Sequence, residues 1–272
     1  MYGCNSADSG KGTMLKFNLQ KGKTYAYSIE FDPEAQMKQG KMASKMRFDY
    51  IINVLDESSD AKRLKVTFKR IATQMGMPNG GMNFDTDSMP RQQNSKDRFS
   101  GTIRNVFNAM KGKSFEMKVD ESGHIEEITG TKEMAESMVN AMNLDANMKQ
   151  IVLQMFNTQF SDESIKKSFD QALNIYPAKR VNPGDKWTKQ TSIEFFMMNA
   201  SMSTNYTVKE IKGNLVTLVT DGTLEMNNGN GTSKGTMIVD AATGLVKEAN
   251  ITQNVRGNFN LDNSIKITGV ER

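Results

Sequence analysis

The two most reactive side-chain types occur once each in this chain. A sequence of 272 residues holds one histidine, His124, and one cysteine, Cys4. These counts exclude a zinc site built from His and Cys side chains and exclude an internal disulfide. A Cys–His dyad would need Cys4, which lies on a flexible end. A Ser-His-Asp triad would need His124, but its surroundings predict a hairpin turn, and a solvated turn residue is the better interpretation.

Carboxylates are plentiful, but their spacing does not define a site. Asp85 and Asp87 lie on a predicted glycine-rich loop that could take Ca²⁺. The further oxygen ligands, the fixed glycine and the later glutamate of a calcium loop are missing, so solvated turn residues are the better interpretation. Among 31 acidic residues, no pair stands out as the acid and base of a glycoside hydrolase. Asp120 and Asp240 are predicted to shape turns.

Methionine is the outlier of the composition, with 21 residues. Met is unbranched and polarizable, so a Met-rich surface can repack around different apolar guests, such as a fatty acid, another lipid or a hydrophobic peptide. The candidate lining of an apolar-ligand site is Met134, Met138, Met142, Met155 and Phe156. The alternative is that these side chains only fill the space between sheet and helices. Copper has little support, because no M-x-M-x-M run or nearby His accompanies them, and no metal or cofactor is predicted.

Cys4 is a candidate for lipidation. Gly3 and Cys4, followed by small polar residues, resemble the end of a bacterial lipoprotein signal, although the charged and apolar regions that should precede it are absent. Residues 5–13 are rich in Asn, Ser and Gly and predict a flexible tether. A lipid on Cys4 would anchor a folded domain to a membrane. The alternative is an incidental cysteine on a frayed end.

Charge and hydropathy argue against two other modes of interaction. The net charge is only +4, and basic residues alternate with acidic ones, unlike the basic footprint of a nucleic-acid-binding protein. No run of about 18 apolar residues is present, so no membrane-spanning helix is predicted.

Hydrophobic periodicity divides the chain into four parts. Residues 1–13 are the tether. Residues 14–130 alternate as strands do, and they carry an inserted long loop followed by a helix that stops at Gly112. Residues 131–176 change to helical spacing, with Ser161 as the N-cap of a third helix. Residues 177–272 return to strands, and both strand regions are predicted to form one cooperative unit.

The two strand regions repeat the same motifs in the same order. Gly22 and Gly184 each precede a strand that begins with an aromatic residue, and Tyr50 matches Tyr206. The stretch "MKVDESGHIEEIT" likewise matches "MIVDAATGLVKEANIT". We interpret this as one ancestral meander used twice. The predicted fold class is α+β: a duplicated antiparallel β meander, as a curved sheet or half-barrel, with three to four helices covering one face.

The order of these motifs resembles a known family. "LQKGKTYAYSIEFD", "MGMPNGGMNFDTDSMP", "YPAKRVNPGDKWTK" and "GTMIVDAATGLVKEANITQNVRGNF" are together similar to uncharacterised bacterial lipoproteins, catalogued only as a domain of unknown function and common in Bacteroidota. The resemblance covers about residues 14–272. It implies an exported protein anchored through an N-terminal cysteine, and it offers no catalytic residues. The arrangement is also similar to the half-barrels of envelope lipoprotein carriers, an analogy that implies no function.

These observations predict an exported, lipid-anchored, non-catalytic envelope protein that binds an apolar ligand or a partner. The predicted location faces the periplasm or the cell surface, with the anchor in the outer membrane. The alternative is a structural or assembly subunit of an envelope complex that acts through its outer surface. An internal apolar cavity would favour ligand binding, and a flat exposed apolar patch would favour the subunit. An enzyme is a more distant alternative, which would need a deep pocket with converging carboxylates.

Overall fold

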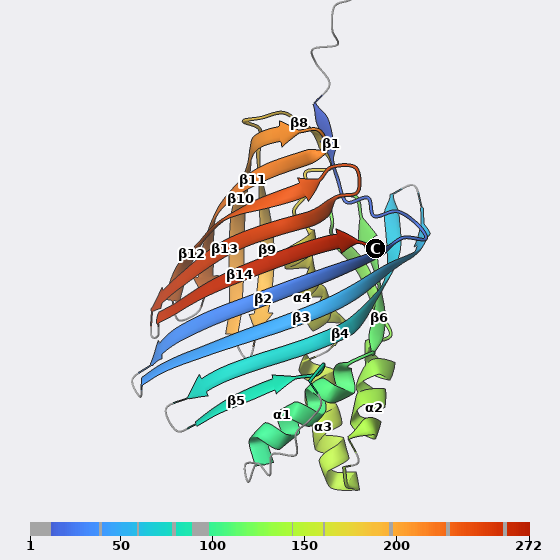
Figure 1. Ribbon diagram of the computed structural model, residues 1–272, viewed down its shortest axis with the longest axis vertical. Coiled ribbons are helices and arrows are strands. Elements are labelled where there is room, and N and C mark those ends of the chain that lie inside the picture. Colours follow the sequence, from blue (N-terminus) through green and yellow to red (C-terminus); the bar gives the residue numbers. More distant parts are fainter. Residues whose placement is uncertain are drawn as a thin grey trace, which may run out of the picture.

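An open, curved antiparallel sheet of twelve strands makes up most of the protein (Figure 1). The structure is a computed structural model. It describes residues 12–37, 40–58, 60–77, 80–88, 98–142, 144–159, 161–195, 198–226, 229–257 and 260–272. Four helices accompany the sheet over these residues. The predicted fold class, an antiparallel curved sheet with helices, is confirmed.

Most of the strands are long. The large sheet contains β2 (Thr24–Met37), β3 (Gly40–Glu57), β4 (Ala61–Met77), β5 (Gly80–Asp85), β6 (Ser114–Asp120), β7 (Ile125–Thr129), β9 (Lys186–Phe195), β10 (Met198–Lys212), β11 (Leu215–Met226), β12 (Gly229–Asp240), β13 (Leu245–Gly257) and β14 (Asn260–Glu271). A separate two-stranded sheet consists of β1 (Thr13–Leu15) and β8 (Lys179–Val181). The helices are α1 (Arg98–Met110), α2 (Thr131–Ala141), α3 (Ala146–Gln159) and α4 (Asp162–Leu173).

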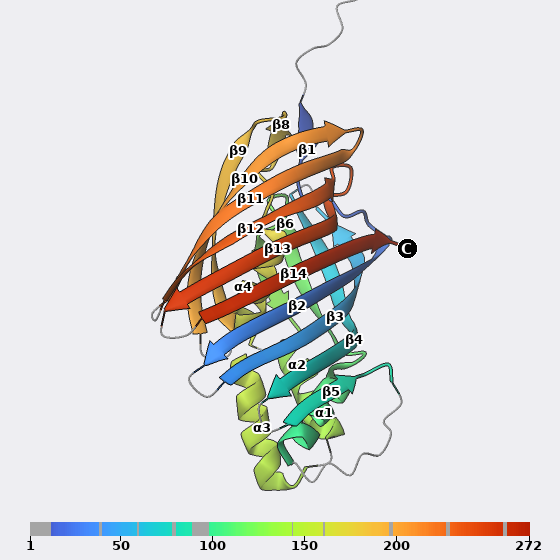
Figure 2. The same ribbon diagram turned by 60° about the vertical axis from the view of Figure 1, so that its left-hand side comes forward.

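The strand order joins the two ends of the chain in the middle of the sheet. Across the sheet the order is β7-β6-β4-β3-β2-β14-β13-β12-β11-β10-β9, with β5 paired to β4 beside this path. The last strand, β14, therefore pairs with β2, and β7 and β9 are the sheet edges. α4 packs against both edges, so a helix lies where a barrel would have strand pairing. In both views α4 lies behind the sheet, whereas α1, α2 and α3 gather at its lower end (Figure 2).

One face of the curved sheet, here called the concave face, carries the hydrophobic core. Successive side chains of a strand point to opposite sides, so alternate residues such as Tyr25 and Tyr27 of β2 are buried on this face. One contiguous cluster contains them together with Phe17 of the N-terminal segment and Phe115 of β6. Burying apolar area of this extent is the main source of stability for such a sheet.

The helices follow the signals that the sequence contains. The Ser161 hydroxyl accepts a hydrogen bond from the Ser164 N–H at 3.1 Å, which confirms the predicted N-cap of α4. Asp162 and Glu163 occupy the first turn, where a negative charge favours the helix dipole. α4 therefore has a well-defined N-terminus.

The two repeated turns, 121–124 and 241–244, meet at one end of the sheet, here called the clasped end. One short segment joins them, because the Phe17 N–H donates to a carbonyl oxygen of the first turn at 2.8 Å and the Asn18 N–H donates to one of the second turn at 3.0 Å. Tyr176 joins them a second time. Its N–H donates to Ser122 O, and its hydroxyl donates to the carbonyl oxygen of the second turn's glycine.

Both turns need glycine. Gly123 and Gly244 have φ values of 82° and 71°, in the left-handed region that favours glycine. A Cβ on Gly123 would lie 1.8 Å from the backbone oxygen of Leu173, and a Cβ on Gly244 would lie 2.4 Å from that of Lys16. No side chain fits at either position.

The aspartates that precede these turns shape them, as predicted. Asp120 Oδ1 accepts hydrogen bonds from the backbone N–H groups of Ser122 (2.8 Å) and His124 (2.9 Å). Asp240 Oδ1 accepts one from the Ala242 N–H at 3.0 Å. Both carboxylates thus satisfy backbone donors that the turn would otherwise leave unpaired.

Two details of the sequence analysis are wrong. Part of the predicted loop after β4 is strand β5, because its backbone pairs with β4 from Ala72 to Met77 despite the Gly and Asn signals.

The second error concerns Tyr206. Trp187 of β9 pairs with Tyr206 of the neighbouring strand β10. The counterpart of Trp187 in the first half, Tyr25 of β2, pairs with Ile52 of β3. Ile52, and not Tyr50, is therefore the counterpart of Tyr206. A register shift between β3 and β4 lies between Asp49 and Tyr50.

Candidate functional site

Three surfaces are candidates for binding: two hollows on the outside and the distal half of the concave face. The described residues contain no group of three His, Cys, Asp or Glu side chains placed to hold a metal ion. No helix in the described part of the chain is long and apolar enough to cross a bilayer. The outer hollows are lined by charged and polar side chains, and the distal half of the concave face carries a row of apolar and small residues.

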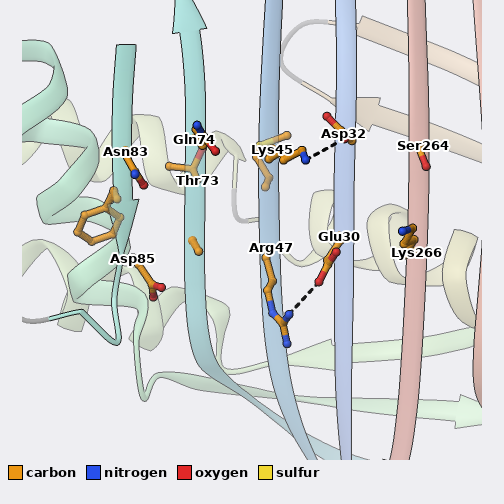
Figure 3. A pocket seen from close by; sticks show the side chains of 13 residues that line it. Glu30, Asp32, Lys45, Arg47, Thr73, Gln74, Asn83, Asp85, Ser264 and Lys266 are labelled. Carbon is orange, nitrogen blue, oxygen red and sulfur yellow. Dashed lines mark hydrogen bonds and ion pairs between the residues drawn. The ribbon is translucent and has the colours of Figure 1, made fainter.

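The larger hollow, of about 350 Å³, lies on the outer face of β2, β3, β4, β5 and β14 (Figure 3). Most of its charged side chains form ion pairs. Arg47 contacts Glu30 at 2.8 Å and Asp49 at 2.9 Å, and Lys45 lies 3.6 Å from Asp32. The pairs of Arg47 with Glu30 and of Lys45 with Asp32 cross between β3 and β2, as is typical of a solvated sheet face, and Arg47 and Asp49 both lie on β3.

Arg70 and Asp85 complete this lattice of ion pairs. Two hydrogen bonds, of 3.0 and 2.5 Å, join the guanidinium to the carboxylate, and this contact lowers the pKa of Asp85. Asp87 pairs with Lys111 at 2.7 Å. The two carboxylates considered for Ca²⁺ thus each have a cationic partner.

The second hollow, of about 320 Å³, lies where α4 meets β9. Its lining is polar and consists of Glu163, Lys166, Lys167, Asp170, Gln190, Thr191, Ser192 and Ser201. It marks the seam between the helix and an edge of the sheet.

A hydrogen-bonded chain crosses this seam. Asp170 Oδ1 lies 2.9 Å from His124 Nδ1 and accepts the Ile125 N–H at 2.9 Å, which ties α4 to the β7 edge. Asn174 Nδ2 donates to Asp170 Oδ2 at 3.1 Å, and Lys189 Nζ of β9 donates to Asn174 Oδ1 at 2.8 Å. Burial lowers the pKa of Lys189. His124, predicted as a turn residue, thus helps attach α4 to the sheet.

The concave face changes character toward the distal end, where β11 ends at Met226 and β12 begins at Gly229. A row of apolar and small residues crosses the sheet there, here called the distal apolar row: Met202, Leu224, Gly231, Val255, Leu261, Ala35 and Met42. Met202, Leu224 and Val255 are buried, yet they lie outside the contiguous core of the described residues. This half of the face has an apolar surface of its own.

A second row lies one pleat closer to the clasped end, here called the polar row: Thr204, Gly222, Ser233, Gln253 and Asn263. Its members face the same side as the apolar rows around it, because they are two residues away from them on each strand. Thr204 and Ser233 are only 6% and 5% exposed. This row was not predicted from the sequence. Polar residues at positions where an alternating strand would normally bury apolar ones are the signal that could have indicated it.

The residues predicted from the sequence lie elsewhere. Met134, Met138 and Met142 of α2 are buried in the contiguous core and do not line either hollow. The side chains of Met155 and Phe156, and the whole of Cys4, lie outside the described residues. Lining of an apolar site by these five side chains and lipidation of Cys4 both stay predictions.

Comparison with solved structures gives two alignments of low sequence identity. Lipovitellin, from a structure concerned with its lipid–protein interactions, aligns with 93% of this chain at 13% identity and a TM-score of 0.49, and this chain spans a quarter (25%) of the lipovitellin chain. DynF, from the dynemicin biosynthesis pathway of Micromonospora chersina, aligns with 98% of this chain and 92% of its own at 4% identity and a TM-score of 0.20. No curated protein matches the chain.

One family match is more direct. Residues 59–246, which run from the start of β4 into β13, match a family of unknown function, DUF6263. The matched region contains both repeated turns, all four helices and most of the polar row. The chain belongs to this family of unknown function, DUF6263.

Proposed function

We propose that the protein is an exported, lipid-anchored, non-catalytic envelope protein that binds an apolar ligand on the distal half of its concave face. In this proposal it is a Bacteroidota lipoprotein of the outer membrane, facing the periplasm or the cell surface, with Cys4 as the anchor. A fatty acid, another lipid or a hydrophobic peptide is the ligand. The resemblance of the motif order to such lipoproteins supports the location, and the concave face supports the ligand.

The observation that carries the ligand is the distal apolar row. Met202 and Leu224 are 7% and 5% exposed, and Met42 continues the row on β3. A core that only has to be stable is usually built from Leu, Ile and Val, whose side chains specify one arrangement. Methionine adapts to guests of different shape, so its use at both ends of this row favours a surface that repacks.

Titration with a neutral fluorescent apolar probe, N-phenyl-1-naphthylamine, tests the proposal. We expect saturable binding with a Kd in the micromolar range, equivalent to about −8 kcal/mol. Met202→Trp should weaken binding at least tenfold by filling the row, and Met148→Trp on the exposed surface of α3 is the matched control. If no probe binds the full chain, or if both variants bind equally, the ligand function is wrong.

Cys4 has its own test. When the full chain is expressed behind a lipoprotein signal, we expect the wild type to partition into detergent and Cys4→Ala to stay in the aqueous phase. Mass spectrometry of the purified protein should show the added lipid only in the wild type. Equal partitioning of the two proteins would show that Cys4 is an incidental cysteine and not the lipid anchor.

A second function has one specific observation in its favour. On α3, Met148 and Ile151 lie one turn apart and are 43% and 61% exposed, so they form an exposed apolar pair. A structural or assembly subunit would use such a surface. Ile151→Glu should then remove the protein from its native complex on a sizing column while leaving probe binding unchanged, and an unchanged elution would argue against this function.

A further inference from the structure

The polar row has an unusual position, buried between apolar rows on the concave face. Thr204 pairs with Gly222 across β10 and β11, and the next pair toward the clasped end is Tyr206 with Thr220. Thr204 and Thr220 are therefore diagonal neighbours on adjacent strands and are 6% and 4% exposed. A sheet that needed only to be stable would place apolar residues at these positions, as it does at Tyr206.

Several polar atoms of this region are buried without a partner. Thr204 Oγ1, Thr220 Oγ1 and Asn263 Oδ1 accept or donate no hydrogen bond within the described part of the chain. Nearly all buried polar groups of native proteins are hydrogen-bonded, because an unpaired one loses its water without compensation. Three such atoms on β10, β11 and β14 require an explanation, and a bound polar group would supply it.

The neighbouring residues determine which atoms stay unpaired. The Cβ that Gly222 lacks would lie 3.1 Å from Thr204 Oγ1, so a side chain at this position would crowd the hydroxyl. The Asn263 amide is held in place, because its Nδ2 donates to Gln253 Oε1 at 3.1 Å and leaves Oδ1 as the unpaired atom. The unpaired atoms are thus two hydroxyls, which donate and accept, and one amide oxygen, which accepts.

The charge of the row decides which head group it accepts. The described members of the row carry no charge, and the nearest cation across the strands, Lys189, already donates to Asn174. A carboxylate or phosphate buried here would lack a free counter-ion, which makes its desolvation costly. A hydroxyl, ester or amide group would satisfy the same atoms without that cost.

We propose that the concave face binds a neutral amphiphile, with its hydrogen-bonding head against Thr204, Thr220 and Asn263 and its hydrocarbon chain along the distal apolar row. This inference rests on the proposed ligand function and adds the chemical class of the ligand. In this proposal the two threonine hydroxyls serve ligand binding and lower the stability of the fold, since valine at both positions would make the sheet more stable.

The test compares three probes of equal chain length on the wild-type full chain: monolaurin with a neutral head, laurate with a charged head, and dodecane with none. Each displaces the fluorescent probe N-phenyl-1-naphthylamine. We expect monolaurin to compete at least tenfold more strongly than dodecane and than laurate. Equal competition by all three, or stronger competition by laurate, overturns the neutral head group and leaves the apolar site in place. If the fluorescent probe itself does not bind, the ligand function fails instead.

A double variant tests whether the two hydroxyls serve ligand binding or the stability of the fold. Thr→Val keeps the shape of the side chain and removes only the hydroxyl. In Thr204→Val/Thr220→Val we expect the Tm to rise by about 2–4 °C for each hydroxyl, while monolaurin binds about tenfold more weakly and the fluorescent probe is unaffected. Thr223→Val, on the exposed outer face of β11, should change neither quantity. A lower Tm with unchanged monolaurin binding would show that the hydroxyls are structural and would overturn the proposal.

Discussion

The clasped end and the distal half of the concave face are buried to a similar degree, yet they treat their polar atoms differently. At the clasped end, the Tyr176 hydroxyl donates to Gly244 O, the Tyr27 hydroxyl accepts the Val246 N–H at 3.3 Å, and the Trp187 indole donates to Ile175 O at 2.8 Å. In the distal half, four buried polar atoms of the described residues have no partner: Thr204 Oγ1, Thr220 Oγ1, Asn263 Oδ1, and Oγ1 of Thr191, which lies opposite Met202. The buried polar groups named at the clasped end are hydrogen-bonded without a ligand, whereas those of the distal half are not.

This difference separates stability from binding within one sheet. A buried network in which every member is paired holds one conformation. Burial also raises the pKa of two of its members, Tyr27 and Tyr176. Unpaired groups weaken the folded state and become useful only when a second molecule pairs with them. The clasped end thus keeps the two halves together, and the distal half is free to be less stable.

The largest expected effect would break the clasped end. Gly123→Ala places a Cβ on the backbone oxygen of Leu173 in a left-handed turn, and we expect the free energy of unfolding to fall by about 3 kcal/mol or more. Gly112 is a matched control, since its φ is 81° but the space around it is empty. Gly112→Ala should cost only about 1 kcal/mol. Urea unfolding measures both, and equal losses would contradict the role of the close contact.

A smaller effect should have opposite signs in the two regions. Tyr176→Phe removes the donor to Gly244 O, and we expect a loss of about 1–2 kcal/mol because a buried carbonyl stays unpaired. Thr220→Val removes a hydroxyl that has no partner, so the free energy of unfolding should rise by about 1 kcal/mol. Paired urea curves of the two variants decide this. Changes of the same sign would mean that the two regions do not differ.

The smallest effect concerns the outer face of the distal half. Contact with Arg70 lowers the pKa of Asp85, so the folded protein binds this proton less readily than the unfolded chain does. The stabilisation is therefore present above the unfolded pKa of about 4 and disappears as the pH falls through the folded value. Asp85→Asn should cost at most about 1 kcal/mol at pH 7 and nothing near pH 2, as judged by Tm against pH. A loss that persists in acid would exclude the ion pair as its cause.

Much of the fold was predictable because local signals agreed with the tertiary structure. The alternation at Tyr25 and Tyr27, the N-cap at Ser161 and the Asp-Gly turns each have a local physical cause. β5 was missed, because its Gly-rich sequence becomes a strand only by pairing with β4. The polar row was missed for a related reason: Thr204 and Ser233 look like ordinary strand residues until the register places them side by side.

The pairing of β14 with β2 has a consequence for how the chain reaches its native state. Tyr25 pairs with Glu271, so the centre of the sheet depends on a contact between the two ends of the domain. Such non-local pairing makes folding slow, because the entropy of closing the intervening chain is lost before the contacts form. During synthesis, β2 would expose an unpaired edge until the final strand had emerged, and exposed edges of this kind promote aggregation.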